Sequence, residues 1–498
     1  MRKILSLSGL IVLAAIIILP NWVGHTAESE VKDIVGQNAL SQSMQLKLTE
    51  YDRGWFTSTG NIQAMIQILP GAIPTEVNVP FKVWHGPVIF KNKQGDGFGL
   101  QVGFASLNGQ AMPVATKPEA LLTQLFPKGP VANVHMKLGF FGTEINTATL
   151  PIDYNSPDLK LQWPGLNTRA LLNHSLDKVQ FHLDNSSLSL QTPQVLLQMG
   201  QFAWKSDATR DENGLWVGDM DVQLAKLSLS DATQRTLFST NQLNFTGTLT
   251  SKDNKASYAS KLDARDVLTQ NILMNELLLD YEVDNLDSQG LAALNQLTNA
   301  LAAGQLNSNM PEQQQALFNT VIKVLSQGPN LTVHQFSVKT NDGTFELDGN
   351  ATLPATSAQT PPNWAQQMQA IKHQSTIQAK VQMDENIARD LVRRVYLGTI
   401  TQLVSPAANG QNPLQGLLTQ QEDNILSGLV SQHILAKHAK GYNVDFTWEK
   451  GMGKLNGQDM ATIGNVAPAA TTAPVAANPS FFNTSTPAAV VPVAPVAK

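Results

Sequence analysis

Residues 56–68 read Phe-Thr-Ser-Thr-Gly-Asn-Ile-Gln-Ala-Met-Ile-Gln-Ile, and this stretch sets the pattern for most of the chain. Counting from Phe56, every second residue except Ser58 is apolar or a glycine, while most residues between them are polar. Successive side chains of a β-strand point to opposite faces, so the alternation gives the strand one apolar and one solvated face. The stretch therefore predicts a long strand in an antiparallel sheet.

The same alternation with a period of two returns along the chain, and turn sequences such as 95–97 (Gly-Asp-Gly) separate the runs. Further runs cover 77–83, 98–104, 134–140, 179–183, 220–224 and 277–283. We therefore expect a mainly β fold of the α+β class, built on a long, curved antiparallel sheet. It comprises a β-rich region over 44–286 and a second β/α region over 329–462.

Two segments change to the helical spacing of three or four residues. Leucines recur at this spacing from Leu291 to Leu301, which predicts the first half of a helical hairpin over 287–328. We expect this hairpin to pack on the sheet. A C-terminal helix is expected over about 417–440, with Gly441 as its cap.

The chain begins with an apolar run from Ile4 to Leu19, preceded by two basic residues and followed by Trp22. A helix over this run and the next few residues would be about 30 Å long, which matches the hydrocarbon core of a bilayer. The positive-inside rule places the N-terminus in the cytoplasm and the body across the membrane, with Trp22 at the interface. The sequence thus predicts one transmembrane helix.

We expect this helix to be an uncleaved signal anchor over 1–27, followed by a juxtamembrane helix within 28–43. A cleaved signal peptide is the alternative. The best cleavage candidate, His25-Thr26-Ala27, has a bulky histidine where signal peptidase requires a small residue. The residues favour the anchor.

Composition excludes several classes of function. The chain has 498 residues, no cysteine and a net charge of −5, so disulfides and thiolate chemistry are absent and nucleic acid is not an expected partner. Residues 463–498 consist mainly of Ala, Pro, Val and Thr, with too little large apolar surface to form a core, and we expect a disordered tail. The remaining chain is long enough for several domains or one extended architecture.

The sequence gives no positive support for an enzyme. It contains no His-Glu-x-x-His, no phosphate-binding Gly-rich loop and no Gly-x-Ser-x-Gly, so we expect neither a catalytic residue nor a metal or other cofactor. Ser175 and Lys178 match the Ser-x-x-Lys of penicillin-interacting enzymes, but the companion motifs are missing. This match is most simply a coincidence.

Two short segments stand out from the strand pattern. The first contains Tyr51, Arg53, Gly54, Phe56 and Ser58, where a glycine and an ion pair interrupt a strand beside three aromatic residues. The second is 85–87, with His85, Gly86 and Pro87. Structurally, they predict a bulge or sheet corner and a tight turn, in which Arg53 bonds sheet carbonyls or pairs with Asp52 or Glu50. We favour this structural role over a functional site.

These two motifs together resemble the shared N-terminal motifs of the YdgA-like proteins, a bacterial family of unknown function (DUF945). The resemblance extends to the apolar N-terminal segment, the long β-rich body and the closing strand-turn-strand at 455–457 (Leu-Asn-Gly). It implies a single-pass protein of the bacterial inner membrane, with its body in the periplasm. It implies no activity and no cofactor.

Three hypotheses for the function follow. The first is a periplasmic scaffold or binding protein, whose apolar sheet face could form a lipid-handling groove if it is left uncovered. Helices that cover this face would exclude the groove. The second is an assembly factor with an envelope protein partner, or one that self-associates, for instance as a homodimer. The third is an envelope hydrolase, which would require His85, Arg53 and a carboxylate to converge in a cleft.

Overall fold

The computed structural model describes residues 24–29, 31–32, 35, 44–66, 75–86, 88–92, 98–114, 125–126, 129–269, 272–302, 311–355, 369, 371–396 and 413–463. The expected anchor with Ile4, Leu19 and Trp22 lies outside these residues, as do Pro87 and the tail from 464. Within the described ranges, no helix is long and apolar enough to cross a membrane.

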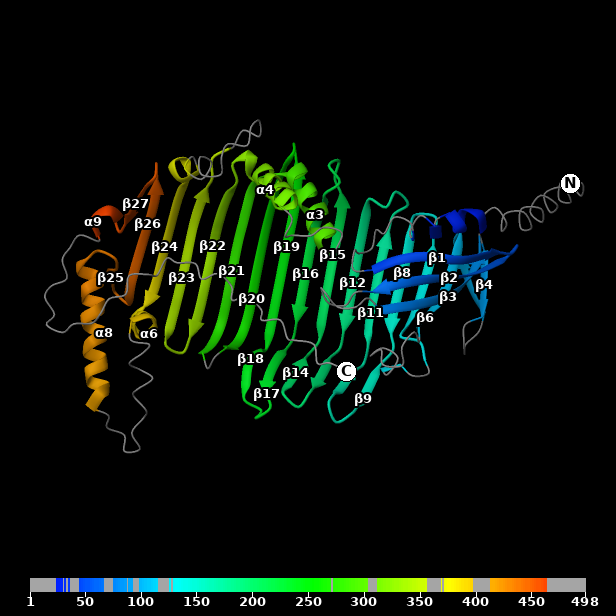
Figure 1. The fold of residues 1–498 in the computed structure, drawn as a ribbon, viewed down its shortest axis with the longest axis horizontal. Coiled ribbons are helices and arrows are strands. Elements are labelled where there is room, and N and C mark those ends of the chain that lie inside the picture. The colour runs from blue at the N-terminus through cyan, green and yellow to red at the C-terminus, as the bar shows by residue number, and fades with distance from the viewer. Residues whose placement is uncertain are drawn as a thin grey trace, which may run out of the picture.

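One antiparallel sheet dominates the molecule (Figure 1). The first half of its main body runs through β1 (Met44–Arg53), β2 (Thr57–Ile66), β3 (Thr75–His85), β6 (Ala105–Pro113), β7 (Ala132–Leu138), β8 (Thr143–Thr149), β11 (Leu166–Leu172), β12 (Lys178–Asn185), β15 (Phe202–Arg210) and β16 (Trp216–Leu224). The second half runs through β19 (Gln242–Lys252), β20 (Lys255–Thr269), β21 (Ile272–Asp287), β22 (Asn330–Thr340), β23 (Gly343–Thr352), β24 (Thr376–Asp384), β26 (Gly441–Glu449), β27 (Met452–Leu455) and β28 (Gln458–Asp459). The expectation of a mainly β protein with a large antiparallel sheet is confirmed.

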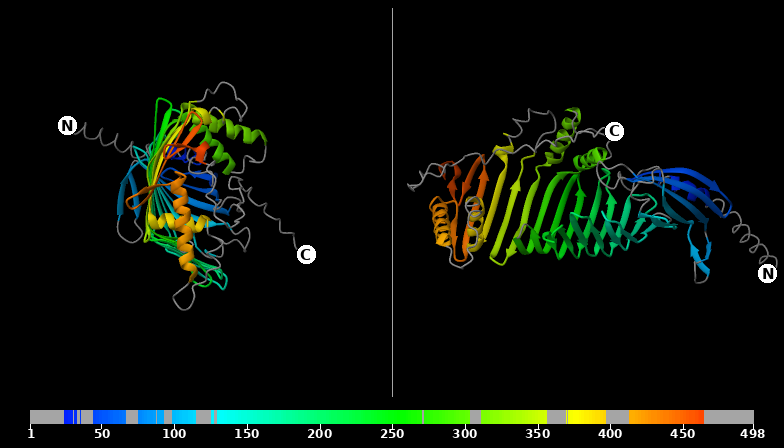
Figure 2. Two further views of the ribbon diagram at one scale, coloured as in Figure 1. Left: turned by 90° about the vertical axis from the view of Figure 1, so that its left-hand side faces the viewer. Right: turned by 60° about the horizontal axis from the view of Figure 1, so that its bottom comes forward.

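Shorter strands complete the sheet. A side branch joins the end of β20 and contains β9 (Ile152–Asn155), β10 (Lys160–Trp163), β13 (Leu188–Gln191), β14 (Val195–Met199), β17 (Leu227–Asp231) and β18 (Thr236–Thr240). β25 (Ala436–His438) pairs with β26, and β4 (Val88–Asn92) and β5 (Phe98–Val102) form a separate hairpin. Viewed from its end, the sheet is bent, and its lower strands curve toward the side that holds the helices (Figure 2).

We call the side of the sheet that carries Val83, Phe245 and Leu279 the inner face, and the opposite side the outer face. The period-two alternation of the sequence produces this division, because residues paired across neighbouring strands share a face. At the N-terminal end, a core forms on the inner face around Val83 and Leu107, which are 0% and 1% exposed. Its cover is the N-terminal helical segment, consisting of the helical residues in 24–35.

The remaining helices are α3 (Ser288–Ala302), α4 (Pro311–Val324), the 3-10 turn η1 (Leu325–Gln327), α6 (Glu385–Tyr396), α8 (Pro413–Ser431) and α9 (Met460–Ile463). α3 begins where β21 ends, because Asp287 Oδ1 accepts a hydrogen bond of 2.6 Å from the backbone N–H of Gly290. α3 and α4 lie side by side at the end of β21 (Figure 1). α6 lies against β23, β24 and β26, and α8 packs on α6.

Two expectations require correction, and a third becomes more specific. Gly441 does not cap the C-terminal helix: α8 ends at Ser431, where the N–H groups of residues 434 and 435 both donate to the Leu429 carbonyl, and Gly441 begins β26. Phe56 does not share a strand face with Ser58, because it lies in the turn before β2 and is 56% exposed. The hairpin α3–α4 packs on the sheet, as expected, but near one end of the strands, where buried Ala292 clusters with Leu215 and Ala256.

Candidate functional site

The two sequence motifs come together at the N-terminal end of the sheet. β1 and β2 form a hairpin in which Arg53 pairs with Ser58, and β3 lies next to β2. The Ser58 hydroxyl lies 2.8 Å from His85 Nε2, and His85 Nδ1 lies 3.2 Å from the carbonyl oxygen of Trp55. A carbonyl only accepts, so Nδ1 carries the proton and Nε2 accepts from Ser58. Both side chains are buried, at 1% and 5% exposure.

The N-terminal helical segment closes over this pair. A Cβ atom on Gly24 would lie 2.5 Å from His85 Cε1, so the helix backbone touches the imidazole ring and only glycine fits there. Arg53 Nη1 lies 3.1 Å from His25 Nδ1 and 3.2 Å from Glu28 Oε2. We call Gly24, His25, Glu28, Arg53, Ser58 and His85 the N-terminal latch.

Charge and burial shift the pKa values of two side chains in and next to the latch. The hydrogen bond from Lys32, at 2.6 Å, lowers the pKa of Glu28, and the positive charges of Lys32 and Arg53 lower it further. Burial raises the pKa of Tyr51, whose ring lies in the core beneath the helical segment. The carboxylate of Glu28 therefore stays ionised and holds the helical segment to Arg53 on the sheet.

The apolar side of the helical segment adds to this attachment. Ala27, Val31 and Val35 are buried against the inner face of β3 and β6. Their spacing of four residues places them on one side of a helix, within the range expected for the juxtamembrane helix.

The remaining motif residues have backbone roles. The N–H of Gly54 donates to the Thr57 carbonyl at 3.0 Å and closes the β1–β2 turn. Gly86 lies so close to the backbone that a Cβ atom there would be 1.7 Å from the Gly103 carbonyl oxygen. The motifs thus shape the corner on which the latch is built.

The serine and histidine of the latch are not exposed as a hydrolase nucleophile would be. Arg53 pairs with Glu28 of the same helical segment that covers His85, but a nucleophile must reach its substrate. Ser58 Oγ is enclosed by the sheet and the helical segment, and His85 is oriented by a backbone carbonyl. Sequence reasoning missed Gly24, His25 and Glu28, although their position directly after the apolar run was an available signal.

A second feature lies beyond the latch, on the inner face. Strand pairing aligns eight apolar side chains, one from each strand between β12 and β23. In order they are Leu183, Trp204, Val222, Phe245, Leu262, Leu279, Phe336 and Leu347. We call them the inner row. At about 4.8 Å per strand, the row is about 34 Å long.

All members of the inner row are half-buried, in contrast to residues beneath the N-terminal helical segment, which are almost completely buried. Among the described helices, α3 packs near one end of the strands, in a cluster with Leu249, Ala256 and Leu286, and α6 contacts strands from β23 onward. The central part of the inner row is therefore not covered by the described helices. Helices that covered this face would have excluded a groove, and the described helices do not cover its central part.

The C-terminal end of the inner face is closed by α6 and α8. Leu426 of α8 and Val392 of α6 are buried with Tyr442, next to Val444. Glu422 of α8 is only 2% exposed and accepts a hydrogen bond of 2.8 Å from Arg393 Nε, which raises the pKa of Arg393. The inner face thus has a helical cover at each end and an open central part.

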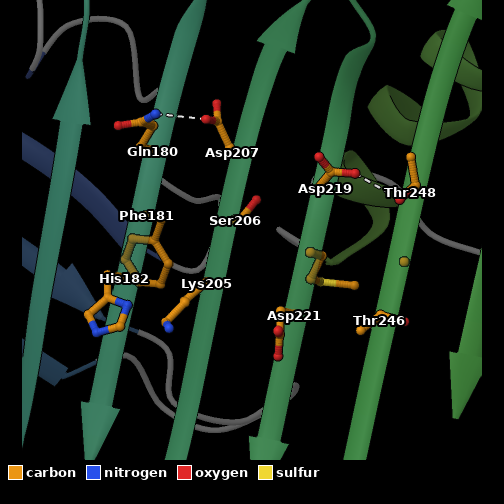
Figure 3. A pocket seen from close by; sticks show the side chains of 12 residues that line it. Gln180, Phe181, His182, Lys205, Ser206, Asp207, Asp219, Asp221, Thr246 and Thr248 are labelled. Atoms are coloured by element: carbon orange, nitrogen blue, oxygen red, sulfur yellow. Dashed lines mark hydrogen bonds between the residues drawn. The ribbon is translucent and has the colours of Figure 1, made fainter.

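The outer face is polar over the same strands. Figure 3 shows this side at β12 to β19, where Gln180 donates to Asp207 and Thr248 donates to Asp219, both at 2.7 Å. Asp219 and Asp221 belong to the solvated face, as their period-two positions predicted. No group of residues with metal-ligand geometry occurs in the described ranges.

The fold and the latch define the class of protein: a mainly β protein built on one large antiparallel sheet, with the N-terminal helical segment held on the start of that sheet. A family model described as a bacterial protein of unknown function (DUF945) matches residues 1–462, and the chain belongs to this family. Neither the curated proteins nor the solved structures gave a match.

Proposed function

We propose that this protein is a membrane-anchored protein of the bacterial envelope that holds the acyl chains of a lipid along its inner row. One observation carries the proposal: eight aligned apolar side chains are only half-buried over a length of about 34 Å. Exposed apolar surfaces of this extent on soluble bodies mark sites for a ligand, a partner or a membrane. A lipid chain suits this surface because it is long, narrow and uncharged.

The proposed location supports this ligand. The apolar run 4–23 is the proposed inner-membrane anchor, with the body in the periplasm. The latch attaches the residues directly after this run to β1–β3, so the anchor would hold the start of the inner face close to the bilayer. The bilayer would then be both the attachment point and the source of the ligand.

The experiment is lipid mass spectrometry on the full chain, purified in detergent and washed extensively to remove loosely bound lipid. We expect about one lipid or more per chain, because removing acyl chains would expose the inner row to water. An unrelated single-pass protein purified in parallel gives the background. A lipid content no higher than this background would overturn the proposal.

An assembly role is a second candidate, with one supporting observation. β1 pairs with β2 on one side, and its other edge carries no strand among the described residues. Such an edge can pair with a strand of a second copy or of an envelope protein. A bulge between Leu48 and Glu50 interrupts this edge, which disfavours regular pairing, so we rank this function below lipid binding.

A further inference from the structure

The outer face contains a hollow that neither the latch nor the inner row explains. It has a volume of about 1370 Å³ and extends across β3, β6, β7, β8, β11 and β12. Side-chain amides dominate its polar lining, with Trp84 at the β3 end. The hollow lies opposite the N-terminal core, on the side of the sheet that faces away from the helices.

The amides form an array across the strands. Gln110 lies opposite Asn133, and Asn167 follows two strands further along the same row. All three side chains are exposed, and Gln110 Nε2 donates to Asn133 Oδ1 at 3.3 Å. An amide has two donor hydrogens and an acceptor oxygen, so this single bond leaves both residues with further hydrogen-bonding capacity.

Arg169 and Asp184, two of the charged residues of the hollow, each have a side-chain partner. Arg169 Nε lies 2.9 Å from Glu144 Oε1, and Asp184 Oδ2 lies 2.5 Å from His182 Nε2. Lys82 is exposed, and its ammonium lies 5.5 Å from the centre of the Trp84 ring. This charge balance does not select an anionic ligand such as nucleic acid, which requires several unpaired cations.

We propose that this hollow binds a segment of a neutral glycan. Sugar hydroxyls both donate and accept hydrogen bonds, as side-chain amides do, and the C–H face of a pyranose ring packs on an aromatic side chain such as Trp84. Neighbouring strands are about 4.8 Å apart, and a linear chain of pyranose rings advances by a similar distance per ring. The array can therefore meet successive sugars.

The test is isothermal titration of the full chain with three neutral tetrasaccharides: a β-1,4-linked N-acetylglucosamine tetramer, cellotetraose and maltotetraose. The detergent must have no sugar head group. We expect saturable binding of at least one tetrasaccharide, weakened at least about tenfold by Trp84→Ala and by Asn133→Ala. Asn133 is exposed, so its variant keeps the test valid if Trp84→Ala fails to fold.

Asp219→Asn is the control, because Asp219 lies in a second, smaller hollow on the same face, which shares only His182 with the first. It is expected to bind the tetrasaccharide with wild-type affinity. The proposal is overturned if none of the three sugars binds, or if Asn133→Ala binds as tightly as the wild type. Binding of anionic polysaccharides alone would also contradict it, because the charge balance argues for a neutral ligand.

Discussion

Val222→Asp is expected to lower the lipid content of the purified protein at least about tenfold. Val222 lies within the inner row, and Trp204 and Phe245 flank it on the neighbouring strands. A carboxylate there would lose its hydration when acyl chains cover it, and this desolvation costs several kcal/mol. A loss of about 1.4 kcal/mol already corresponds to a tenfold change in affinity. Lipid mass spectrometry against the wild-type chain measures the effect.

Gln223→Asp is the matched control. Gln223 is the next residue of β16, points to the outer face and is exposed. The new carboxylate stays in water, so lipid content is expected to remain at the wild-type level. Both variants should fold, because Val222 is only half-buried and Gln223 is exposed. Circular dichroism and thermal unfolding check this. Equal lipid content in both variants and in the wild type would contradict the role of the inner row.

His85→Ala is expected to release the N-terminal helical segment from the sheet. The substitution removes the ring that contacts Gly24 and leaves the buried Ser58 hydroxyl without its acceptor. Losing a buried ring and leaving a buried polar group unpaired together cost about 2–4 kcal/mol. Hydrogen exchange of the amides in β1 to β3 should accelerate, while exchange in β20 to β22 should not change.

Phe56→Ala provides the comparison for the latch. Phe56 belongs to the same motif but is 56% exposed in the turn, so its removal is expected to change stability by less than about 0.5 kcal/mol. The opposite result for His85→Ala would contradict its role in the latch. If His85→Ala left hydrogen exchange and cellular abundance unchanged but abolished function in cells, His85 would have a chemical role.

The sequence pattern was sufficient to predict the sheet but not where the helices dock on it. Alternation assigns each strand residue to a face, and the inner row contains residues that the pattern had placed on apolar faces, such as Val222 and Leu279. Which face remains open depends on where the helices dock. The spacing of Leu291 and Leu301 predicts a helix and cannot show that it packs at the strand ends.

The latch was predictable only in part, because its local motifs are visible in the sequence and its long-range contacts are not. Tyr51, Arg53, Ser58 and His85 stood out as two local motifs, and a corner and a turn were expected at their positions. Their common neighbour, the N-terminal helical segment, was not evident, because Glu28 of this segment precedes Arg53 by 25 residues and contacts it only in the folded protein. The expected pairing of Arg53 with Asp52 or Glu50 was therefore replaced by a long-range pair.

Site-specific photocrosslinking in living cells tests the central claim most directly. A photoreactive phenylalanine analogue is placed at Phe245 or Leu279 on the inner row, and at their outer-face neighbours Thr246 or Asp280. After irradiation, mass spectrometry of the purified chain identifies the adducts. We predict lipid adducts at the two inner positions and none at the two outer ones. Equal labelling of both faces, or only protein adducts at Phe245 and Leu279, would contradict a lipid-binding inner face.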